Sequence, residues 1–576
     1  MQAIVLILVL SVVCADRYHP ERLATSAGRI NPGEEKSQFW YNEAEAGIKA
    51  RVARGASIEG QKAKNIIMFL GDGMSVPTLA AARTLLGQRN HATGEEAQLS
   101  FEEFPTLGLS KTYCTNQQIP DSACTATAYL CGVKANYGTI GVTAEVRRSD
   151  CAAYMDPATH VESIAEWALE DGRDVGIVTT TRITHASPAG TYAKVANRTW
   201  ENNLFVEQLG YNTNDCPDIA HQLVHMNPGK QFKVILGGGR REFLSDTMRD
   251  EENARGRRTD GRNLIEEWQE DKRNRNVSYA YVGNRGQLFE AAENMPEYLL
   301  GLFKRTHLEY NMQRDPEIDP TLEELTEVAI KSLSRSEKGF FLFVEGGRID
   351  HAHHDNYVHL ALDETIEFSK AVKKATELLP EEDTLIVVTS DHAHVMAFNG
   401  YSPRGHDILG PSTDRGSDGV PYMTLSYTNG PGGEVANRQH VDGIRPDVTQ
   451  EANFYNDLEW RSHVDVPLHS ETHGGDDVAV FARGPQHTMF SGLYEQSQIP
   501  HLMAYAACIG PGLHACRYES IQTTESPQAT ESLQVPESTE PTDSSESSED
   551  NSAHINQVTL LVFLPALISL ILHFRR

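Results

Sequence analysis

Four short apolar runs, each followed at once by polar residues, restrict the folds open to this chain more than any other feature. The runs occupy residues 65–70, 174–180, 339–344 and 384–389. Continuous apolar runs of this length are typical of strands buried on both faces of a parallel sheet. Helical patterns lie between them, at 161–169, 321–333 and 363–379. Strands that alternate with helices predict an α/β fold, with a large, mostly parallel central sheet flanked by helices on both faces.

The residues that follow the four runs include acids, hydroxyls and imidazoles. Because ligands collect outside the carboxyl ends of the strands in such a sheet, we expect these side chains along one edge. One Asp after a strand is often only a helix cap or a turn residue. Four such strand ends together favour a metal site instead. The candidate residues are Asp72, His185, Ser187, Glu345, Asp350, His354, Asp391 and His392.

The residue types indicate which metals the site would bind. Asp350 and His354 are four residues apart, so they share a face if the segment is helical. Imidazole and carboxylate ligands without a thiolate suit catalytic zinc. An oxygen set such as Asp72, Ser187 and Glu345 suits Mg²⁺. The other histidines of these segments are interpreted as supporting or surface residues rather than ligands: His351, His353 and His394.

Ser122 is the candidate nucleophile. It precedes an Ala- and Thr-rich run at 123–128 that is typical of a helix start. Free N–H groups at a helix N-terminus favour a bound anion such as phosphate. The alternative is a serine that only caps the helix. The chain has no G-x-S-x-G elbow, and a serine without a partnered base is open to activation by metal coordination.

Composition excludes some functions. The 576 residues include 51 Lys and Arg against 80 Asp and Glu, a formal net charge of −29. We expect no nucleic-acid partner, because phosphate affinity comes from Lys and Arg. A hydrophobic content of 39% is that of a globular protein. At the N-terminus, an apolar run at 3–13 and a small residue at Ala15 predict a secretory signal over 1–15; a buried first strand is the alternative.

The C-terminal region changes composition sharply. Residues 518–553 are rich in Ser, Thr, Glu and Pro and lack Lys and Arg, which predicts a solvated stalk. An apolar tail at 558–574 is shorter than the roughly 20 residues that a span needs. Small residues, a polar spacer and this tail predict a GPI-anchor signal over 554–576, with attachment at Ser544 or Asn551. The alternative is a single-pass helix with a cytoplasmic Arg pair.

Seven of the eight cysteines lie beyond the expected signal. In a secreted protein six of them can pair, which leaves one over. Cys508 and Cys516 are close enough to close a small loop. Cys151 with Cys216 and Cys114 with Cys124 are plausible pairs, although sequence alone does not determine the connectivity, and Cys131 would then be a buried free thiol. Of two N-glycosylation sequons, at Asn197 and Asn276, the second lies in a polar stretch and is the expected acceptor.

Several long motifs resemble one known family. They include NIIMFLGDGM, PDSACTATAYLCG, VTTTRITHASPAGTYA, FFLFVEGGRIDHAHH, TSDHAHV and ETHGGDDVAVFARGP, in this order, between residues of about 40 and 516. Together they resemble the alkaline phosphatases, in particular the membrane-anchored animal enzymes, including the insect gut type. The resemblance implies a catalytic domain over 16–517, with a crown insertion at about 400–466.

The resemblance also implies roles for single residues. It gives each subunit two zinc ions and one magnesium ion. The implied ligands are Asp350, His354 and His473 for the first zinc, Asp72, Asp391, His392 and Ser122 for the second, and Asp72, Ser187 and Glu345 for magnesium, with His185 beside it. Ser122 would form a phosphoserine, and Arg198 would clamp the phosphate. The implied reaction is hydrolysis of a broad range of phosphomonoesters on the outer cell surface.

Other implied features concern assembly and stability. The family forms homodimers, in which Tyr401 would face the active site of the partner subunit. The pairs Cys151–Cys216 and Cys508–Cys516 match its disulfides. Three positions depart from relatives: Cys124, which would form an extra disulfide with Cys114; Lys304, which replaces a calcium-binding carboxylate near Asp319; and Ser470, where some relatives have an acid. We therefore expect no calcium ion.

Three rival functions share some of these features. A sulfatase needs Cys-x-Pro-x-Arg at the nucleophile, and residues 124–128 lack both Pro and Arg. A phosphodiesterase would dispense with a dedicated arginine clamp, which Arg198 supplies. A surface binding protein with an inactive site would lack some metal ligands, whereas the full set is present in this sequence.

Overall fold

The computed structural model describes residues 31–433, 443–451, 454 and 457–516. By internal contacts the chain divides into Met1–Thr524 and Glu525–Arg576, and all described residues belong to the first unit. The expected signal at 1–15, the stalk at 518–553 and the anchor signal at 554–576, with Ser544 and Asn551, lie outside the described residues. In the part of the chain that is described, no helix combines the length and the apolar character needed to span a bilayer.

A ten-stranded sheet forms the centre of the fold, in the order β17-β2-β16-β8-β1-β7-β3-β4-β6-β5. Its pairs are parallel except those of β16, which runs antiparallel to β2 and β8. The strands are β1 (Asn65–Gly71), β2 (Thr106–Lys111), β3 (Asp174–Arg182), β4 (Val234–Gly238), β5 (Tyr279–Val282), β6 (Tyr298–Leu302), β7 (Phe340–Gly346), β8 (Thr384–Thr389), β16 (Val478–Arg483) and β17 (Gly492–Glu495). The four runs singled out in the sequence are the adjacent central strands β8, β1, β7 and β3.

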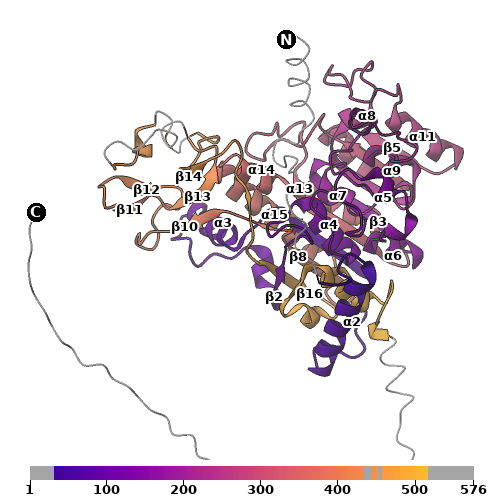
Figure 1. The fold of residues 1–576 in the computed structure, drawn as a ribbon, viewed down its shortest axis with the longest axis horizontal. Helices are drawn as coiled ribbons and strands as arrows, with labels where there is room; N and C mark the ends of the chain where they lie inside the picture. Colours follow the sequence, from indigo (N-terminus) through magenta and orange to yellow (C-terminus); the bar gives the residue numbers. More distant parts are fainter. Residues whose placement is uncertain (1–30, 434–442, 452–453, 455–456, 517–576) are drawn as a thin grey trace, which may run out of the picture. The chain divides into compact units, whose positions relative to one another are not determined.

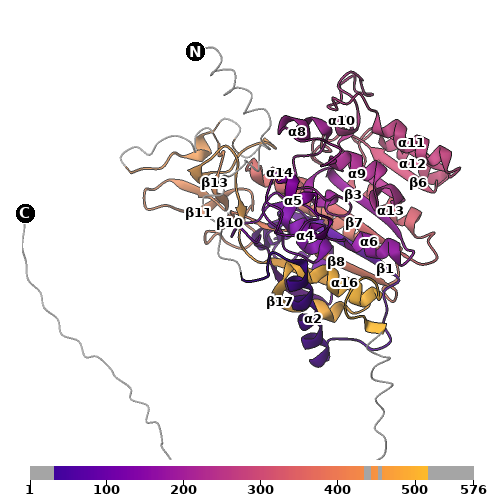
Figure 2. The same cartoon turned by 45° about the vertical axis from the view of Figure 1, so that its right-hand side comes forward.

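Side chains of the central strands alternate between two hydrophobic cores, one on each face of the sheet. In β1, Ile66, Met68 and Leu70 belong to one core, and Ile67 and Phe69 belong to the other. The first core includes residues of α4 (Ser122–Cys131), α6 (Ile164–Glu170), α9 (Ile219–His225), α11 (Leu264–Asn274) and α16 (Ile499–Ala507). The second includes α3 (Val76–Arg89), α13 (Leu322–Leu333) and α15 (Val358–Leu378). Figures 1 and 2 show these helices around the sheet, which confirms the expected α/β class.

The register brings the ends of the central strands to one level. Leu70, near the end of β1, is paired with Glu345 of β7 and with Thr389 of β8. Residues that follow these strands therefore emerge at the same edge of the sheet. The remaining helices and turns of the described chain are α2 (Ser37–Ala53), α5 (Cys151–Tyr154), α7 (Ala186–Ala189), α8 (Asn203–Gln208), α10 (Arg240–Phe243), α12 (Arg285–Glu293), α14 (Arg348–His354), and the 3₁₀ turns η1 (Ser100–Glu103), η2 (Pro157–Thr159), η3 (Gly229–Gln231), η4 (Val448–Gln450), η5 (His487–Phe490) and η6 (Gln496–Gln498).

The segment after β8 forms small sheets of its own, coloured orange in Figure 1. One consists of β10 (Met396–Phe398), β13 (Leu425–Gly430) and β14 (Val464–Pro467), and another of β11 (Pro411–Arg415) and β12 (Pro421–Met423). These strands lie within or beside the expected crown insertion. A third pair, β9 (Ala393–His394) with β15 (His473–Gly474), returns the chain to the end of β8. This pairing places His473 beside the residues that follow the central strands.

Candidate active site

Ser122 is the first residue of α4 and is fully buried. Asp121 caps the helix: its Oδ1 accepts hydrogen bonds from the backbone N–H of Cys124 at 3.2 Å and of Gly138 at 2.9 Å. Ser122 Oγ lies 3.2 Å from Nε2 of His392. The hydroxyl is therefore held at a helix N-terminus, next to an imidazole, and the capping residue of the helix is Asp121 rather than Ser122.

His392 and two carboxylates form the group nearest to Ser122. Nε2 of His392 lies 3.2 Å from Oδ2 of Asp391 and 3.5 Å from Oδ1 of Asp72. Asp391 also accepts a hydrogen bond from the backbone N–H of Gly73 at 3.0 Å. Gly73 has φ +67°, and a Cβ there would lie 2.3 Å from the ring of His394, so the turn after β1 requires glycine. The expected second zinc set is thus brought together by three segments.

The expected first zinc set also converges. Oδ1 of Asp350 lies 3.4 Å from Nε2 of His354, one helical turn away on α14, and 3.3 Å from Nε2 of His473. Each histidine donates its Nδ1–H to a backbone carbonyl, His354 to Glu471 at 2.6 Å and His473 to Pro120 at 2.7 Å. Because a carbonyl only accepts, the proton of each neutral ring is on Nδ1, and Nε2 presents a lone pair to the cluster.

Glu471 and His394 support this set; a supporting role was one of the two expected for His394, whereas Glu471 was not singled out. Nε2 of His394 lies 2.8 Å from Oδ1 of Asp350, and its Nδ1 contacts the Glu471 carboxylate. Both ring nitrogens are engaged by carboxylates, so His394 is a buried supporting residue and not a surface one. His353 is also buried, between Thr78 and Tyr427. The signal for Glu471 was its place in the quoted ETHGG motif, two residues before His473.

The expected magnesium set lies near the ends of β1, β3 and β7. Ser187 Oγ is 3.5 Å from Oδ2 of Asp72, and Glu345 Oε2 accepts hydrogen bonds from the hydroxyls of Thr179 and Thr181, the latter at 2.9 Å. Neither threonine was among the candidate residues, although the two occupy alternate positions along β3. One ligand atom each of Asp72, His185 and Glu345 lies within 4.8 Å of the others.

Arg198 connects the nucleophile helix with this region. Its Nη1 donates to Oδ2 of Asp121 at 3.0 Å, and its Nη2 lies 3.1 Å from Nε2 of His185. Arg198 is only 3% exposed. Asp121 is the carboxylate next to the nucleophile, and it both caps the first turn of α4 and pairs with this arginine.

The buried acids fit a group of bound cations. Burial raises the pKa of Asp72 well above its usual range, and the carboxylates of Asp391, Asp350 and Glu345 raise it further. Burial also raises the pKa of Glu345 to about 7. One oxygen each of Asp72, Glu345 and Asp350 is buried without a hydrogen-bond partner. Close like charges and unsatisfied oxygens are stabilised by positive ions. Ligand atoms also lie within 4.8 Å of one another in the groups Asp350–His392–His394–His473, His354–His394–Glu471 and Asp72–Asp391–His392.

Other candidate residues lie outside this cluster. The structure pairs Cys114 with Cys124, Cys151 with Cys216 and Cys508 with Cys516, and leaves Cys131 as a buried thiol. Asn276 is exposed, whereas Asn197 is fully buried. Tyr401 is 94% exposed. Ser470 Oγ lies 3.3 Å from Nδ1 of His354. Lys304 Nζ lies 3.0 Å from Oδ1 of Asp319, so an ammonium group occupies the surroundings of the one carboxylate expected for calcium.

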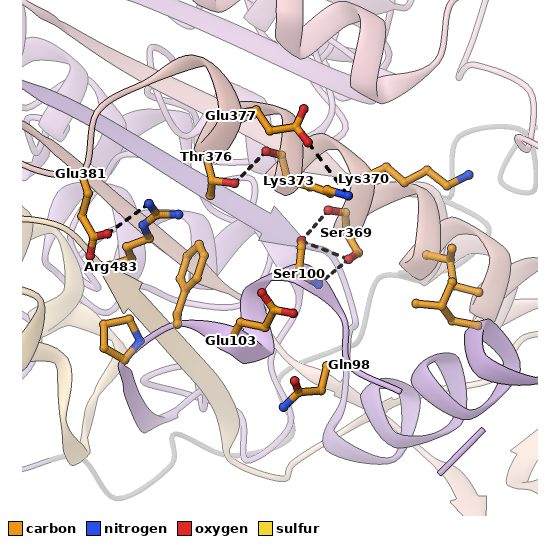
Figure 3. A pocket seen from close by; sticks show the side chains of 14 residues that line it. Gln98, Ser100, Glu103, Ser369, Lys370, Lys373, Thr376, Glu377, Glu381 and Arg483 are labelled. Atoms are coloured by element: carbon orange, nitrogen blue, oxygen red, sulfur yellow. Dashed lines mark hydrogen bonds and ion pairs between the residues drawn. The ribbon is translucent and has the colours of Figure 1, made fainter. Parts of the chain in front are cut away.

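A cavity of about 620 Å³ lies elsewhere, between η1, α15 and β16 (Figure 3). None of the cluster residues lines it. Its cations are matched by acids: Arg483 lies 3.1 Å from Glu381, and Lys373 lies 3.9 Å from Glu377. Lys370 is paired with Glu367 in the same way, so the cations that line the cavity all have an acidic partner and do not mark an anion site.

Comparison with known proteins agrees with this geometry. The model of the alkaline phosphatase family matches residues 63–509. The membrane-bound alkaline phosphatase of Bombyx mori is 64% identical over 506 residues, 87% of this chain and 91% of that protein. The tissue-nonspecific isozyme of Rattus norvegicus is 45% identical over 506 residues, 86% of this chain and 93% of that protein.

Solved structures show the same fold. The alkaline phosphatase of Thermus thermophilus superposes with a TM-score of 0.56 at 23% identity, covering 82% of this chain and 98% of that one. The buried His and Asp groups are consistent with the metals of such an enzyme. From the matched family model and the two animal relatives, we conclude that the chain belongs to the alkaline phosphatases and is a phosphomonoester hydrolase.

Proposed function

We propose that the enzyme hydrolyses a broad range of phosphomonoesters through a phosphoserine on Ser122. The observation that supports this most directly is the position of Ser122, at the N-terminus of α4, with Oγ 3.2 Å from His392. Unpaired N–H groups of the first turn favour a tetrahedral anion at this point. A serine that served only as a cap would not face a cluster of imidazoles and carboxylates.

The ligand sets fit two zinc ions and one magnesium ion. Asp350, His354 and His473 would hold one zinc, and Asp72, Asp391 and His392, with Ser122, would hold the second. Asp72, Ser187 and Glu345 would hold magnesium, with His185 beside it. When bound, such ions lower the pKa of hydroxyl groups and stabilise oxyanions. The contact between Lys304 and Asp319 supports the expectation that calcium is not a cofactor.

The protein's own groups position the phosphate. Arg198 presents a planar guanidinium that suits two phosphoryl oxygens at once. Asp121 holds this guanidinium at 3.0 Å through Oδ2 while its Oδ1 caps the nucleophile helix, so the clamp and the nucleophile share one support. These groups contact the phosphoryl end of a substrate and not the alcohol, which supports activity on varied phosphomonoesters.

The test is hydrolysis of a simple phosphomonoester at alkaline pH by the metal-loaded enzyme. Ser122→Ala should lower kcat by about 10³-fold or more, as loss of a nucleophile does elsewhere. Ser334→Ala, at an exposed serine after α13, should not change it. Acid-quenched protein should carry phosphate on Ser122. Full activity of Ser122→Ala would refute the assignment. A comparable rate on a phosphodiester would favour the rival function.

We also propose a homodimer attached to the outer cell surface. Tyr401 is 94% exposed, which suits a contact with the partner subunit's active site. A catalytic domain over 16–517, a stalk at 518–553 and a GPI signal over 554–576 would place this enzyme outside the cell, and the Bombyx mori relative is membrane-bound. Release from membranes by a phosphatidylinositol-specific phospholipase supports the lipid anchor. Retention supports the single-pass alternative, and sedimentation measures the oligomeric state.

A further inference from the structure

Arg348 lies at the start of α14, at the same sheet edge as the active site, and its side chain is partly exposed. Its guanidinium carbon lies 3.7 Å from the centroid of the Tyr310 ring. Its Nη1 donates to Nδ1 of His351 at 3.0 Å. Stacking on an aromatic ring and a hydrogen bond to an imidazole fix the orientation of the cation without neutralising its charge.

Arg348 has no direct ion pair among the described residues. Among the described residues, no carboxylate lies within 4.0 Å of its guanidinium, and its Nε is buried without a hydrogen-bond partner. Glu364 attracts Arg348 only at longer range, and its carboxyl accepts a hydrogen bond from the backbone N–H of Asn311 at 2.6 Å. A partly buried cation without a counter-ion is costly, so it favours a bound anion.

Two other arginines at this edge are balanced. Arg182 forms a paired contact with Glu201 at 2.7 Å, and Arg198 is paired with Asp121 at 3.0 Å. Arg348 is therefore the exception among three guanidinium groups around one site.

A row of imidazoles connects Arg348 with the phosphate clamp. The ring of His351 lies 5.5 Å from that of His185, whose Nε2 lies 3.1 Å from Arg198. The His307 ring lies 4.2 Å from that of His351 and contacts Arg182. Hence Arg348 lies on the same side of the sheet as the clamp, separated from it by the rings of His351 and His185.

We propose that Arg348, stacked on Tyr310, binds a second phosphate, carried by the alcohol half of the substrate. This inference rests on the proposed function, because it takes Ser122 and Arg198 as the place of the reacting phosphate. A guanidinium is the side chain best suited to phosphate, and in a chain of net charge −29 local cations decide where a polyanion binds. Bisphosphorylated substrates of one spacer length are thus favoured over their monophosphates.

The experiment compares two series of substrates on the metal-loaded enzyme. One series consists of linear alkanediol bisphosphates of increasing spacer length, and the other of the matching monophosphates with a terminal hydroxyl. In the wild type, the ratio of kcat/KM between the series should peak at one length, by about 10- to 100-fold, the factor of one charge-assisted hydrogen bond. Arg348→Met should remove the peak, and Arg348→Lys should retain part of it.

Controls separate this inference from the proposed function. Arg335→Met, at an exposed arginine before β7 and so at the opposite edge of the sheet, should keep the peak. A flat wild-type ratio, or a peak that persists in Arg348→Met, would overturn the subsite. No hydrolysis of either series by the wild type would overturn the proposed function itself. A measurement without variants uses alkane diphosphonates as inhibitors: tighter inhibition than monophosphonates at the same spacer supports the subsite, and equal inhibition contradicts it.

Discussion

Asp121 Oδ2 lies 3.0 Å from Nη1 of Arg198, and the other oxygen of the same carboxylate caps the helix that begins with Ser122. One side chain therefore aligns the nucleophile helix and the guanidinium. Both groups are buried, so water screens the charge of the arginine only weakly.

Asp121→Asn should separate the two roles. Asparagine still caps a helix but carries no charge, so Arg198 loses its ionic partner and the clamp loses its fixed orientation. We expect the inhibition constant for inorganic phosphate and the KM for a phosphomonoester to rise about 5- to 30-fold, the effect of about 1–2 kcal/mol. Asp150→Asn, at the cap of α5, is the matched control and should change neither constant. Unchanged phosphate inhibition in Asp121→Asn would show that Arg198 keeps its orientation without this partner.

The contact of His394 with Glu471 and Asp350 predicts a change in metal affinity. Groups that orient a ligand typically alter metal binding 10- to 100-fold when they are removed. Glu471→Gln should therefore raise the zinc concentration needed for half-maximal activity by about this factor, with activity recovered at high zinc. Glu166→Gln is the control, because Glu166 of α6 forms an ion pair of its own, with Lys194 at 2.9 Å. Zinc content after dialysis against buffered zinc checks the result independently of activity, and equal zinc content in both variants would contradict the prediction.

The central strands were predictable because burial on both faces of the sheet restricts the residue type at each of their positions. A strand buried on both faces must be apolar at each position, so β8 coincides with the apolar run 384–389, and β1 extends the run 65–70 by one residue. Helix starts were less accurate. The helix expected to start at 363 begins at Val358, a few residues after the end of α14. No side chain caps its N-terminus, so the sequence has no cap motif that would mark this start.

Contacts between distant segments were not predictable from the residues alone. Asp121 and Arg198 are 77 positions apart, and either one, taken alone, looks like a cap or a surface cation. His394 and Glu471 meet because β9 pairs with β15, two strands too short to leave a pattern in the sequence. The ligand types were visible at the strand ends, whereas the residues that hold the ligands in place depend on how the chain folds back.

His501 predicts how stability depends on pH. It is buried against Trp167 and Tyr41, and burial lowers its pKa from 6.5 to about 4. Between these values the unfolded chain binds more protons than the folded chain, so stability falls as the pH falls from 6.5 toward 4. At pH 5 the loss from this group is about 2 kcal/mol.

His501→Leu removes this titration without adding a polar group to the core. Denaturant unfolding at neutral pH and at pH 5 should show that the variant loses about 2 kcal/mol less than the wild type on acidification. The comparison uses the difference between the two proteins, because the metal ligands of both titrate alike. An equal acid-induced loss in both proteins would exclude His501 as a contributor.

The Cys114–Cys124 disulfide joins the loop after β2 to the first turn of α4, two residues beyond Ser122. The backbone N–H of Cys124 also donates to Asp121, so the bond holds the same turn that supports the clamp. Replacing both cysteines by serine should lower the free energy of unfolding by about 2–3 kcal/mol and weaken phosphate inhibition. The Cys508–Cys516 disulfide closes a loop of similar length, with a sequence separation of 8 against 10. Replacing Cys508 and Cys516 by serine is the control, and it should reduce stability without changing phosphate inhibition. Thermal unfolding and phosphate inhibition are measured for both double variants and the wild type. If the variant without Cys114 and Cys124 loses stability but keeps the wild-type phosphate inhibition, packing of α4 positions the nucleophile without the disulfide.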